Sequence, residues 1–333
     1  MNVLVTGGLG YIGSHVVVEL LVAGHEVTVV DNLGNCDLSV KMGIEKASGG
    51  KSFTFYDVDI CDRGALDVVF CMDKIDCVVH FAALKAVGLS VSQPLEYYGN
   101  NVGGMVSLLQ VMQRHNVHKL VFSSSATVYG TPKSVPIYED FEIQAINPYG
   151  HTKVMAEQII RDYAIANPEF CAASLRYFNP VGAHSSRCIG ESPKGIPNNL
   201  MPLVCKVASG EMAQLKVFGD DYDTVDGTCV RDYVHVVDLS IGHLRAVDYV
   251  MGHKGVESFN LGTGNGTTVL QLIKEFENVN NVKVPYEIVG RREGDTTTLI
   301  AGVQKAKDML KWEAKLGVAE MCKDHFEYAR KKA

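Results

Sequence analysis

The sequence predicts an α/β protein in which helices cover both faces of a doubly wound parallel sheet, followed by a smaller mixed α/β domain. Short β-rich runs alternate with helical patterns through the first half of the chain, an order typical of parallel sheets. The β-rich runs are continuous stretches of apolar residues, as expected of strands buried on both faces. A glycine-rich turn joins the first of these runs to the first helical pattern.

The elements of the first half follow one another in a regular order. The expected strands are Asn2–Thr6, Glu26–Val30, Ser52–Phe55, Cys77–Phe81, Lys119–Phe122 and Cys171–Leu175. Between them lie helical patterns, and Pro148 occupies a position that is favoured in the first turn of a helix. The expected helices are Tyr11–Ala23, Arg63–Phe70, Leu95–His115 and Pro148–Ala166.

A change in composition after Arg176 predicts a domain boundary. The stretch from Asn179 to Asn199 is rich in glycine and proline, and loop segments of this length are usually functional or disordered. We therefore expect residues 1–178 to form the parallel-sheet domain and residues 179–333 to form the second domain. A helix and a strand between about residues 231 and 261 are expected to return to the sheet.

Length, charge and cysteine usage limit the classes of function. The 333 residues are enough for about two domains, and the net charge of −7 argues against a nucleic-acid partner. The nine cysteines contain no Cys-x-x-Cys pair and the histidines form no ligand motif, so we expect free thiols and no metal. No apolar run reaches the ~18 residues of a membrane span, and no secretory signal pattern is present. These features predict a cytoplasmic protein with no membrane partner.

The first turn has the glycine spacing of a dinucleotide-binding site. Gly7, Gly10 and Gly13 are three residues apart, and Gly8 with the last two satisfies G-x-G-x-x-G. Such glycines allow a tight turn, close approach of a pyrophosphate and close packing of a helix whose N-terminus attracts phosphate. The pattern alone is explained at least as well by a tight turn. Asp31, at the end of the second strand, adds a carboxylate that suits a ribose diol and repels a 2′-phosphate, so a Rossmann-type domain that binds NAD is expected.

Two further motifs place reactive side chains near the same edge of the predicted sheet. Tyr149 and Lys153 form Tyr-x-x-x-Lys on one face of a predicted helix. An ammonium, together with a positive nicotinamide, would favour the phenolate and make the tyrosine a general base. An isolated pair of this kind is more often a surface tyrosine beside a surface lysine. The run Ser123–Ser125 follows a buried strand, where hydroxyls can face a ligand, although a polar turn also explains it.

Eight motifs resemble those of the UDP-galactose 4-epimerase family of extended short-chain dehydrogenases/reductases, in order and near the family's spacing. They are TGGLGYIG, HFAALKAV, SSSATVYG, NPYGHTK, RYFNPVGAH, GIPNNLMP, VRDYVHV and RREGD. They extend from Thr6 to Asp295 and so cover most of the chain. The match is far more specific than the glycine turn alone.

The resemblance implies a reaction. In the family, NAD stays bound while hydride passes from sugar carbon 4 to the nicotinamide. The 4-keto sugar then turns and takes the hydride back on its other face, which interconverts UDP-galactose and UDP-glucose. Tyr149 would be the general base and acid, Lys153 would bind the nicotinamide ribose and lower the phenol pKa, and Ser125 would hydrogen-bond the reacting oxygen. A homodimer is expected by analogy with the family.

The resemblance also implies the binding residues. Around NAD they are Gly7, Gly10, Tyr11, Ile12, Gly13, Asp31, Asn32, Asp59, Ile60, Phe81, Ala82, Lys85, Asn100, Ser123, Tyr149, Lys153, Tyr177 and Phe178. Around the UDP-sugar they are Ser125, Tyr149, Phe178, Asn179, Asn199, Leu200, Arg231, Tyr233, Arg292, Asp295 and Leu299. The chemistry agrees, because guanidinium groups suit a pyrophosphate and amides suit sugar hydroxyls.

The sequence departs from the family at two places and leaves alternatives open. The loop between Ser125 and Tyr149 is about one residue shorter than usual. Leu299 stands where the family often has Tyr or a small residue beside sugar carbon 2, so acceptance of N-acetylated UDP-hexosamines is undecided.

Among other enzymes of the scaffold, a 4,6-dehydratase or decarboxylase is the first alternative. Dehydratases typically carry an acidic pair where Ala126 and Thr127 stand here. Glucuronate epimerases are nearer, but no clear extra cation is present for a sugar carboxylate. A non-catalytic NAD-binding protein would be expected to have lost the tyrosine, the lysine or the serines.

Overall fold

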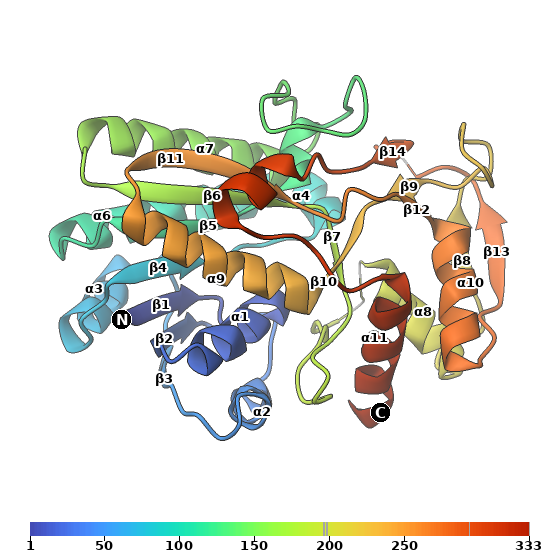
Figure 1. The fold of residues 1–333 in the computed structure, drawn as a ribbon, viewed down its shortest axis with the longest axis horizontal. Helices are drawn as coiled ribbons and strands as arrows, with labels where there is room; N and C mark the ends of the chain where they lie inside the picture. Colours follow the sequence, from blue (N-terminus) through green and yellow to red (C-terminus); the bar gives the residue numbers. More distant parts are fainter. Residues whose placement is uncertain (196, 198, 293, 333) are drawn as a thin grey trace.

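The computed structural model describes residues 1–195, 197, 199–292 and 294–332, and its centre is a seven-stranded parallel sheet (Figure 1). Across the sheet the strands are β3 (Thr54–Asp57), β2 (Glu26–Asp31), β1 (Asn2–Thr6), β4 (Cys77–His80), β5 (Lys119–Ser125), β6 (Cys171–Tyr177) and β11 (Gly255–Leu261). Because every pairing is parallel, all seven carboxyl ends lie at one edge. The strand order reverses between β1 and β4, which is where such sheets bind ligands.

The apolar strands divide their side chains between two cores, one on each face of the sheet. Val3 and Val5 of β1 belong to one core, and Leu4 between them belongs to the other. The first core is covered by α1 (Tyr11–Val22) and α9 (Val236–Gly252), and the second by α3 (Arg63–Met72), α6 (Gly104–Arg114) and α7 (Pro148–Ala166). This three-layer arrangement confirms the predicted fold class and explains why the strand sequences do not alternate with polar residues.

Several elements of the sheet domain differ from the predicted ones. Strand β3 begins two residues later than expected, and helices α2 (Ser39–Ala47) and α4 (Val87–Ser92) were not predicted. The expected helix Leu95–His115 is divided into α5 (Pro94–Tyr97), a π-helical turn η1 (Tyr98–Gly103) and α6. The cause lies in tertiary contacts: the Asn101 side chain in η1 donates to the carbonyl of Leu84 and to the hydroxyl of Thr152, both at 3.0 Å. Such π-helical turns often occur at functional sites.

The segment expected to return to the sheet does so. Helix α9 packs against α1 and the sheet. Strand β11 pairs with β6 over its full length, from Gly255 opposite Cys171 to Leu261 opposite Tyr177. The stretch predicted as a long loop starts with a short strand, β7 (Asn179–Val181), and contains an isolated bridge between Ala183 and Gly190.

The remaining elements form a smaller group at one end of the sheet (Figure 1). Its strands are β7 with β10 (Tyr233–His235), β8 (Leu215–Phe218) with β13 (Tyr286–Val289), and β9 (Val230–Arg231) between β12 (Thr267–Thr268) and β14 (Thr298–Leu299). Its helices are α8 (Leu200–Ala208), α10 (Val269–Asn280) and α11 (Val318–Lys332), and two short turns, η2 (Ala126–Tyr129) and η3 (Ala306–Leu310), lie against the sheet domain. Val204, Phe276 and Phe326 from the three helices share a third core. Ile196 and Asn198 of GIPNNLMP and Glu293 of RREGD lie outside the described residues.

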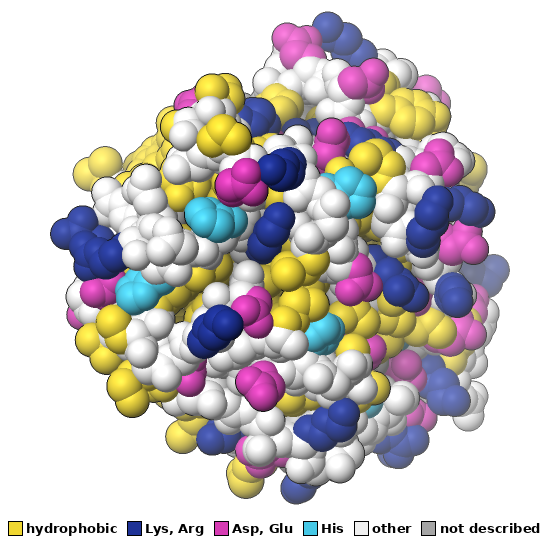
Figure 2. Space-filling model, turned by 60° about the vertical axis from the view of Figure 1, so that its left-hand side comes forward, with side chains coloured by type: hydrophobic (Ala, Val, Ile, Leu, Met, Phe, Trp, Pro, Cys, Tyr) yellow, Lys and Arg dark blue, Asp and Glu magenta, His cyan; other side chains and the backbone are white. Residues whose placement is uncertain are grey.

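The surface mixes the two signs of charge. Figure 2 shows Lys and Arg side chains interspersed with Asp and Glu on the face viewed. All nine cysteines are unpaired thiols, six of them buried. Within the described part of the chain, no helix combines the length and the apolar character needed to cross a membrane.

Candidate active site

The turn between β1 and α1 has no room for a side chain at Gly7 or at Gly13. Gly7 has a φ of +68°, and a Cβ there would lie 2.7 Å from the backbone nitrogen of Ala82. A Cβ on Gly13 would lie 2.2 Å from the carbonyl oxygen of Gly7. Gly10 is the N-cap of α1 and supplies no side-chain cap, so the first N–H groups of the helix are available to an anion. The turn therefore fits the pyrophosphate of a dinucleotide.

Tyr11 and Ile12, also predicted at the cofactor, begin α1. The Tyr11 hydroxyl donates a hydrogen bond to the carbonyl oxygen of Gly182 at 2.7 Å. Burial and, secondly, the charge of Glu191 raise the pKa of Tyr11 well above its usual value. The first turn of α1 is thereby joined to the segment that follows β7.

The predicted ribose-binding residues lie at the ends of β2 and β3. Asp31 is buried, and its carboxylate accepts a hydrogen bond from the backbone nitrogen of Leu9 in the glycine turn at 3.1 Å. The Asn32 side chain donates to the carboxylate of Asp59 at 2.9 Å, and Ile60 beside it is buried. The Asp31 carboxylate thus lies against the glycine turn, where an acidic residue can bind a ribose diol.

The other predicted cofactor residues follow β4 or lie in η1. Phe81 and Ala82 come directly after β4, and Ala82 is the residue that a Cβ on Gly7 would strike. The Lys85 ammonium pairs with the carboxylate of Glu191 at 3.3 Å. Asn100 lies in η1 and donates to the side chain of the neighbouring asparagine at 2.9 Å.

Helix α7 carries the predicted Tyr–Lys pair in the expected register. Asn147 caps the helix by accepting a backbone N–H at 2.8 Å, and Pro148 occupies its first turn. The Lys153 nitrogen lies 5.7 Å from the centre of the Tyr149 ring, which places both side chains on one face of the helix. Lys153 is buried and donates to the carbonyl oxygen of Ser123 at 2.7 Å, so it joins α7 to β5.

The serine run forms the last three residues of β5 rather than a turn after it. The Ser125 hydroxyl accepts hydrogen bonds from the backbone nitrogen and the hydroxyl of Thr127 at 3.2 and 2.9 Å. The Ser124 hydroxyl instead donates to Glu157 at 2.6 Å. These two consecutive serines therefore serve different groups, and Ser125 is the one whose hydroxyl opposes the rise in the pKa of Tyr149.

Burial governs the protonation of the Tyr–Lys pair. It raises the pKa of Tyr149 to about 12, against the opposing hydrogen bond with Ser125. It lowers the pKa of Lys153 to about 7, against the opposing charge of Glu157. We expected the ammonium to lower the phenol pKa, but among the protein's own groups burial outweighs it. The protein's own groups alone therefore keep the phenol protonated near neutral pH, and a further positive charge is needed to ionise it.

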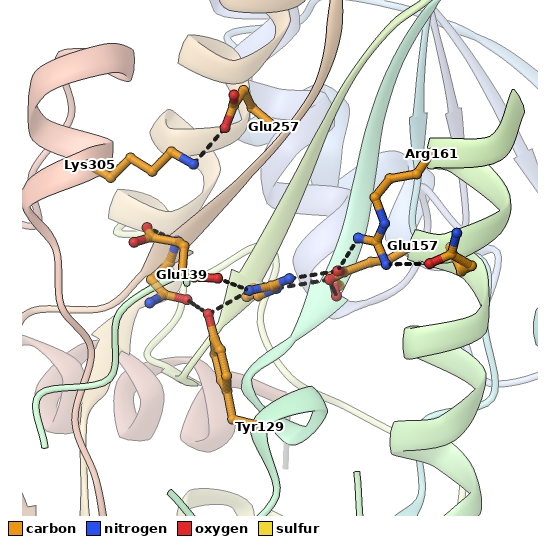
Figure 3. Close-up of polar contacts among 10 residues, drawn as sticks. Tyr129, Glu139, Glu157, Arg161, Glu257 and Lys305 are labelled. Carbon is orange, nitrogen blue, oxygen red and sulfur yellow. Dashed lines mark hydrogen bonds and ion pairs between the residues drawn. The ribbon is translucent and has the colours of Figure 1, made fainter. Parts of the chain in front are cut away.

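A buried polar network connects Glu157 of α7 with Tyr129 of η2 (Figure 3). Glu157 accepts two hydrogen bonds from the Arg176 guanidinium, at 2.7 and 3.0 Å, besides the one from Ser124. Arg176 also donates to the Tyr129 hydroxyl at 2.8 Å, and this hydroxyl donates to the amide oxygen of Asn260 at 2.7 Å. The network ties the strand that carries the serines to α7, β6, η2 and β11.

Five of the predicted substrate residues form a group around β9 and η2. Phe178 and Leu299 pack in the small core formed by η2. Leu299 on β14 lies opposite Arg231 on β9. Arg231 and Arg292 both contact the Asp295 carboxylate, at 3.5 and 2.8 Å. Two forked cations beside one carboxylate can bind a pyrophosphate on their remaining N–H groups.

The remaining predicted residues lie on β6, β7, β10 and α8. Tyr177 ends β6 and its hydroxyl contacts the ring of His243. Tyr233 is buried in β10, and Asn179 pairs with it at the start of β7. Asn199 precedes Leu200 at the start of α8 and donates to Glu191 at 2.5 Å.

The sequence did not predict Glu191, although it contacts two of the predicted residues. The only available signal was that Glu191 is the one acidic residue between Asn179 and Asn199. The sequence also indicated no role for Thr127, which was considered only because dehydratases typically have an acidic residue at this place. In the structure its hydroxyl donates to the Ser125 hydroxyl.

Known proteins resemble the chain over nearly all of its length. A family model described as GDP-mannose 4,6 dehydratase matches residues 4–325. A UDP-glucose 4-epimerase of Bacillus subtilis (strain 168) is 53% identical over 328 residues, which are 98% of this chain and 96% of the relative. The chain belongs to the UDP-glucose 4-epimerase family. This confirms the resemblance found in the motifs.

Solved structures of the UDP-glucose 4-epimerase family have the same fold. The Bifidobacterium longum enzyme, in complex with NAD+ and UDP, has a TM-score of 0.96 and 48% identity, covering 99% of this chain and 98% of its own. The Stenotrophomonas maltophila enzyme, with bound NAD and formylated UDP-arabinopyranose, has a TM-score of 0.97 and 46% identity, covering 100% and 98%.

Proposed function

We propose that the protein is an NAD-dependent isomerase that interconverts UDP-galactose and UDP-glucose at sugar carbon 4. The observation that carries the proposal is the placement of Tyr149, Lys153 and Ser125 together at the carboxyl end of β5, on the same edge of the sheet as the glycine turn that follows β1. Family relatives named as UDP-glucose 4-epimerases, and solved relatives that contain NAD with UDP or a UDP-sugar, support it.

NAD fits the residues present. Gly7 and Gly13 lack the space for a Cβ, which leaves backbone N–H groups open to a pyrophosphate, and Asp31 offers a carboxylate to a ribose. We assign Asn32, Asp59, Ile60, Phe81, Ala82, Lys85, Asn100, Ser123, Tyr177 and Phe178 to the same site. When bound, the cofactor supplies reversible hydride transfer at carbon 4.

The protein's own side chains then transfer the proton of the 4-hydroxyl and orient the sugar. Tyr149 takes the proton from the 4-hydroxyl and returns it, while Ser125 holds the reacting oxygen by a hydrogen bond. Lys153, held in place by the carbonyl of Ser123, brings its amino group close to the phenol and binds the nicotinamide ribose. Arg231 and Arg292 bind the UDP pyrophosphate.

The remaining substrate assignments complete the site. Phe178, Asn179, Asn199, Leu200, Tyr233, Asp295 and Leu299 contact the UDP-sugar in this proposal. Epimerisation is favoured over dehydration, because Ala126 and Thr127 supply no carboxylic acid next to Ser125. Leu299 in the core of η2 leaves UDP-N-acetylhexosamines as a second substrate class to test.

We infer that residues 1–178, rejoined by about 231–261, form the NAD domain and that residues 179–333 supply the UDP-sugar domain. We also infer a homodimer in the cytoplasm. Family analogy supports the dimer, and nine unpaired cysteines suit a reducing compartment.

Replacing Tyr149 by Phe tests the proposal. Turnover of UDP-galactose should fall by a factor of roughly 10² to 10⁴, as expected for loss of a general acid–base, with NAD still bound. Tyr163→Phe on the same helix is the matched control, because the Tyr163 hydroxyl has no hydrogen-bond partner within the described residues. Near-normal turnover of Tyr149→Phe would remove this residue from the mechanism.

A further inference from the structure

A single buried carboxylate connects the cofactor residues to the substrate residues. The Glu191 side chain is 3% exposed, and its Oε1 oxygen accepts from the Lys85 ammonium at 3.3 Å and from the Asn199 amide at 2.5 Å. Lys85 belongs to the segment after β4 that we assign to NAD, and Asn199 to the start of α8 that we assign to the sugar nucleotide.

The backbone fixes the position of this carboxylate. Gly190, the preceding residue, bridges to Ala183, and a Cβ on Gly190 would lie 2.4 Å from the ring of Tyr328 on α11. The residue before Glu191 is therefore pressed against α11. Glu191 is close enough to α1 for its charge to act on the Tyr11 hydroxyl. The bridge to Ala183 and the contact with α11 therefore fix the backbone next to Glu191.

The contact also orients Asn199. The Asn199 side chain makes no capping bond to α8, so its amide is free for Glu191. A carboxylate accepts only, which fixes the amide nitrogen toward Glu191 and leaves the amide oxygen and the second N–H for a ligand. Lys85 uses one of its three N–H donors on Glu191 and, being 48% exposed, can offer the others to an anion.

The Glu191 carboxylate lies between the residues assigned to two anionic ligands, and its negative charge repels both. Such a placement is explained if the carboxylate orients the donors that bind those ligands. Burial of this carboxylate without partners would be unfavourable, and its two hydrogen-bond donors offset that cost. We propose that Glu191 is a positioning residue that holds Asn199 for the sugar nucleotide and Lys85 for the cofactor. This inference rests on the proposed function of the same site.

The sugar side is tested with Glu191→Ala and Asn199→Ala, singly and together. Glu191→Ala should raise the KM for UDP-galactose about tenfold, as for loss of a hydrogen bond to a charged group, and change kcat less than about threefold. UDP-glucose affinity, measured by calorimetry in the inactive Tyr149→Phe background, should fall by the same factor. The double variant should bind no more weakly than Asn199→Ala alone, because the effect acts through that side chain.

The cofactor side uses Lys85→Met in the same way. The amount of NAD retained after gel filtration is measured by denaturing the protein. It should be lower in Glu191→Ala than in the wild type. The double variant Glu191→Ala/Lys85→Met should retain as much NAD as Lys85→Met alone. Glu191→Gln, which keeps the volume and one acceptor oxygen, should give smaller effects of the same direction and serves if the alanine variant does not fold. Glu169→Ala is the control, since its pair with Lys254 is exposed and should matter little.

The outcomes separate the two proposals. If the wild type does not convert UDP-galactose, the proposed function fails whatever the variants do. If the wild type is active, unchanged substrate affinity in Glu191→Ala overturns the positioning role. Losses that multiply in the double variants also overturn it, because they would show that Glu191 acts independently of Asn199 and Lys85.

Discussion

Replacing Arg176 by Met would leave the charge of Glu157 buried without its main partner. Arg176 makes four hydrogen bonds, two to Glu157, one to Tyr129 and one to the carbonyl of Glu139. Glu157 is fully buried, and its other partners are Ser124 and, at 3.4 Å, Arg161. Removing one member of a buried ion pair typically costs about 3–5 kcal/mol. We expect a loss of unfolding free energy of this size.

The corresponding thermal shift follows from the length of the chain. An unfolding entropy of about 2.1 cal/mol/K per residue gives roughly 0.7 kcal/mol/K for 333 residues. The Arg176→Met variant should therefore melt about 4–7 °C below the wild type. Calorimetry and urea unfolding, both at saturating NAD, measure the shift.

The loss should also depend on pH in a defined direction. Burial pushes the pKa of Glu157 upward, but Arg176 outweighs it, and the net pKa is below the usual value. Without Arg176, burial raises that pKa above its unfolded value. The variant is then penalised as pH rises through that interval, so the difference from wild type should be larger at pH 8 than at pH 5.

Two further variants decide whether the buried charge is the cause. Arg176→Met/Glu157→Leu removes both charges and should recover part of the stability that the single variant loses. Lys305→Met breaks the partly exposed pair with Glu257 at 2.6 Å (Figure 3) and should cost at most about 1 kcal/mol. A single variant as stable as the wild type, or a double variant as unstable as the single, would refute the reasoning.

Three other predictions follow from the site. Gly13→Ala should lose bound NAD, measured on the denatured protein, because its Cβ would lie 2.2 Å from the Gly7 oxygen, whereas Gly252→Ala meets no atom within 4 Å and should retain NAD. The Lys153 pKa of about 7 lies below its unfolded value, so the folded NAD-free protein binds fewer protons from pH 7 upward. Its stability should therefore rise between pH 7 and 8.5 relative to Lys153→Met, and equal slopes in chemical denaturation would contradict the shift. Leu299→Ala should increase turnover of UDP-N-acetylgalactosamine relative to UDP-galactose, measured by chromatography, and an unchanged ratio would place Leu299 away from carbon 2.

The parallel sheet could be predicted because its sequence signal is local. Val3, Leu4 and Val5 are all buried, so the apolar run marks the strand directly. The β5 strand continues into the polar Ser123–Ser125 because these residues pair with β6, from Leu175 to Tyr177. This pairing is a tertiary contact and cannot be predicted from the hydropathy of the three serines. The same reason explains why the two- to four-residue strands β7 to β10 and β12 to β14 were not predicted, since they are too short to show a period.

The residues of the site also fall into those that a local pattern predicts and those that depend on tertiary contacts. The glycine turn and the pair Tyr149–Lys153 each lie within one turn or one helix, so spacing and motif were enough to predict their placement. The contacts of Glu191 with Lys85 and Asn199 join separate elements, and no local pattern predicts them. The rise in the Tyr149 pKa depends on how deeply α7 is buried, which the motif does not contain.

The most direct test of the account is to incubate the purified protein with UDP-galactose, without added cofactor, and to follow UDP-glucose by chromatography. The account predicts conversion to a mixture of the two sugars with no net formation of NADH, because hydride taken from carbon 4 returns to it. No conversion, even after NAD is added, would contradict the assignment of UDP-galactose and UDP-glucose as the substrates.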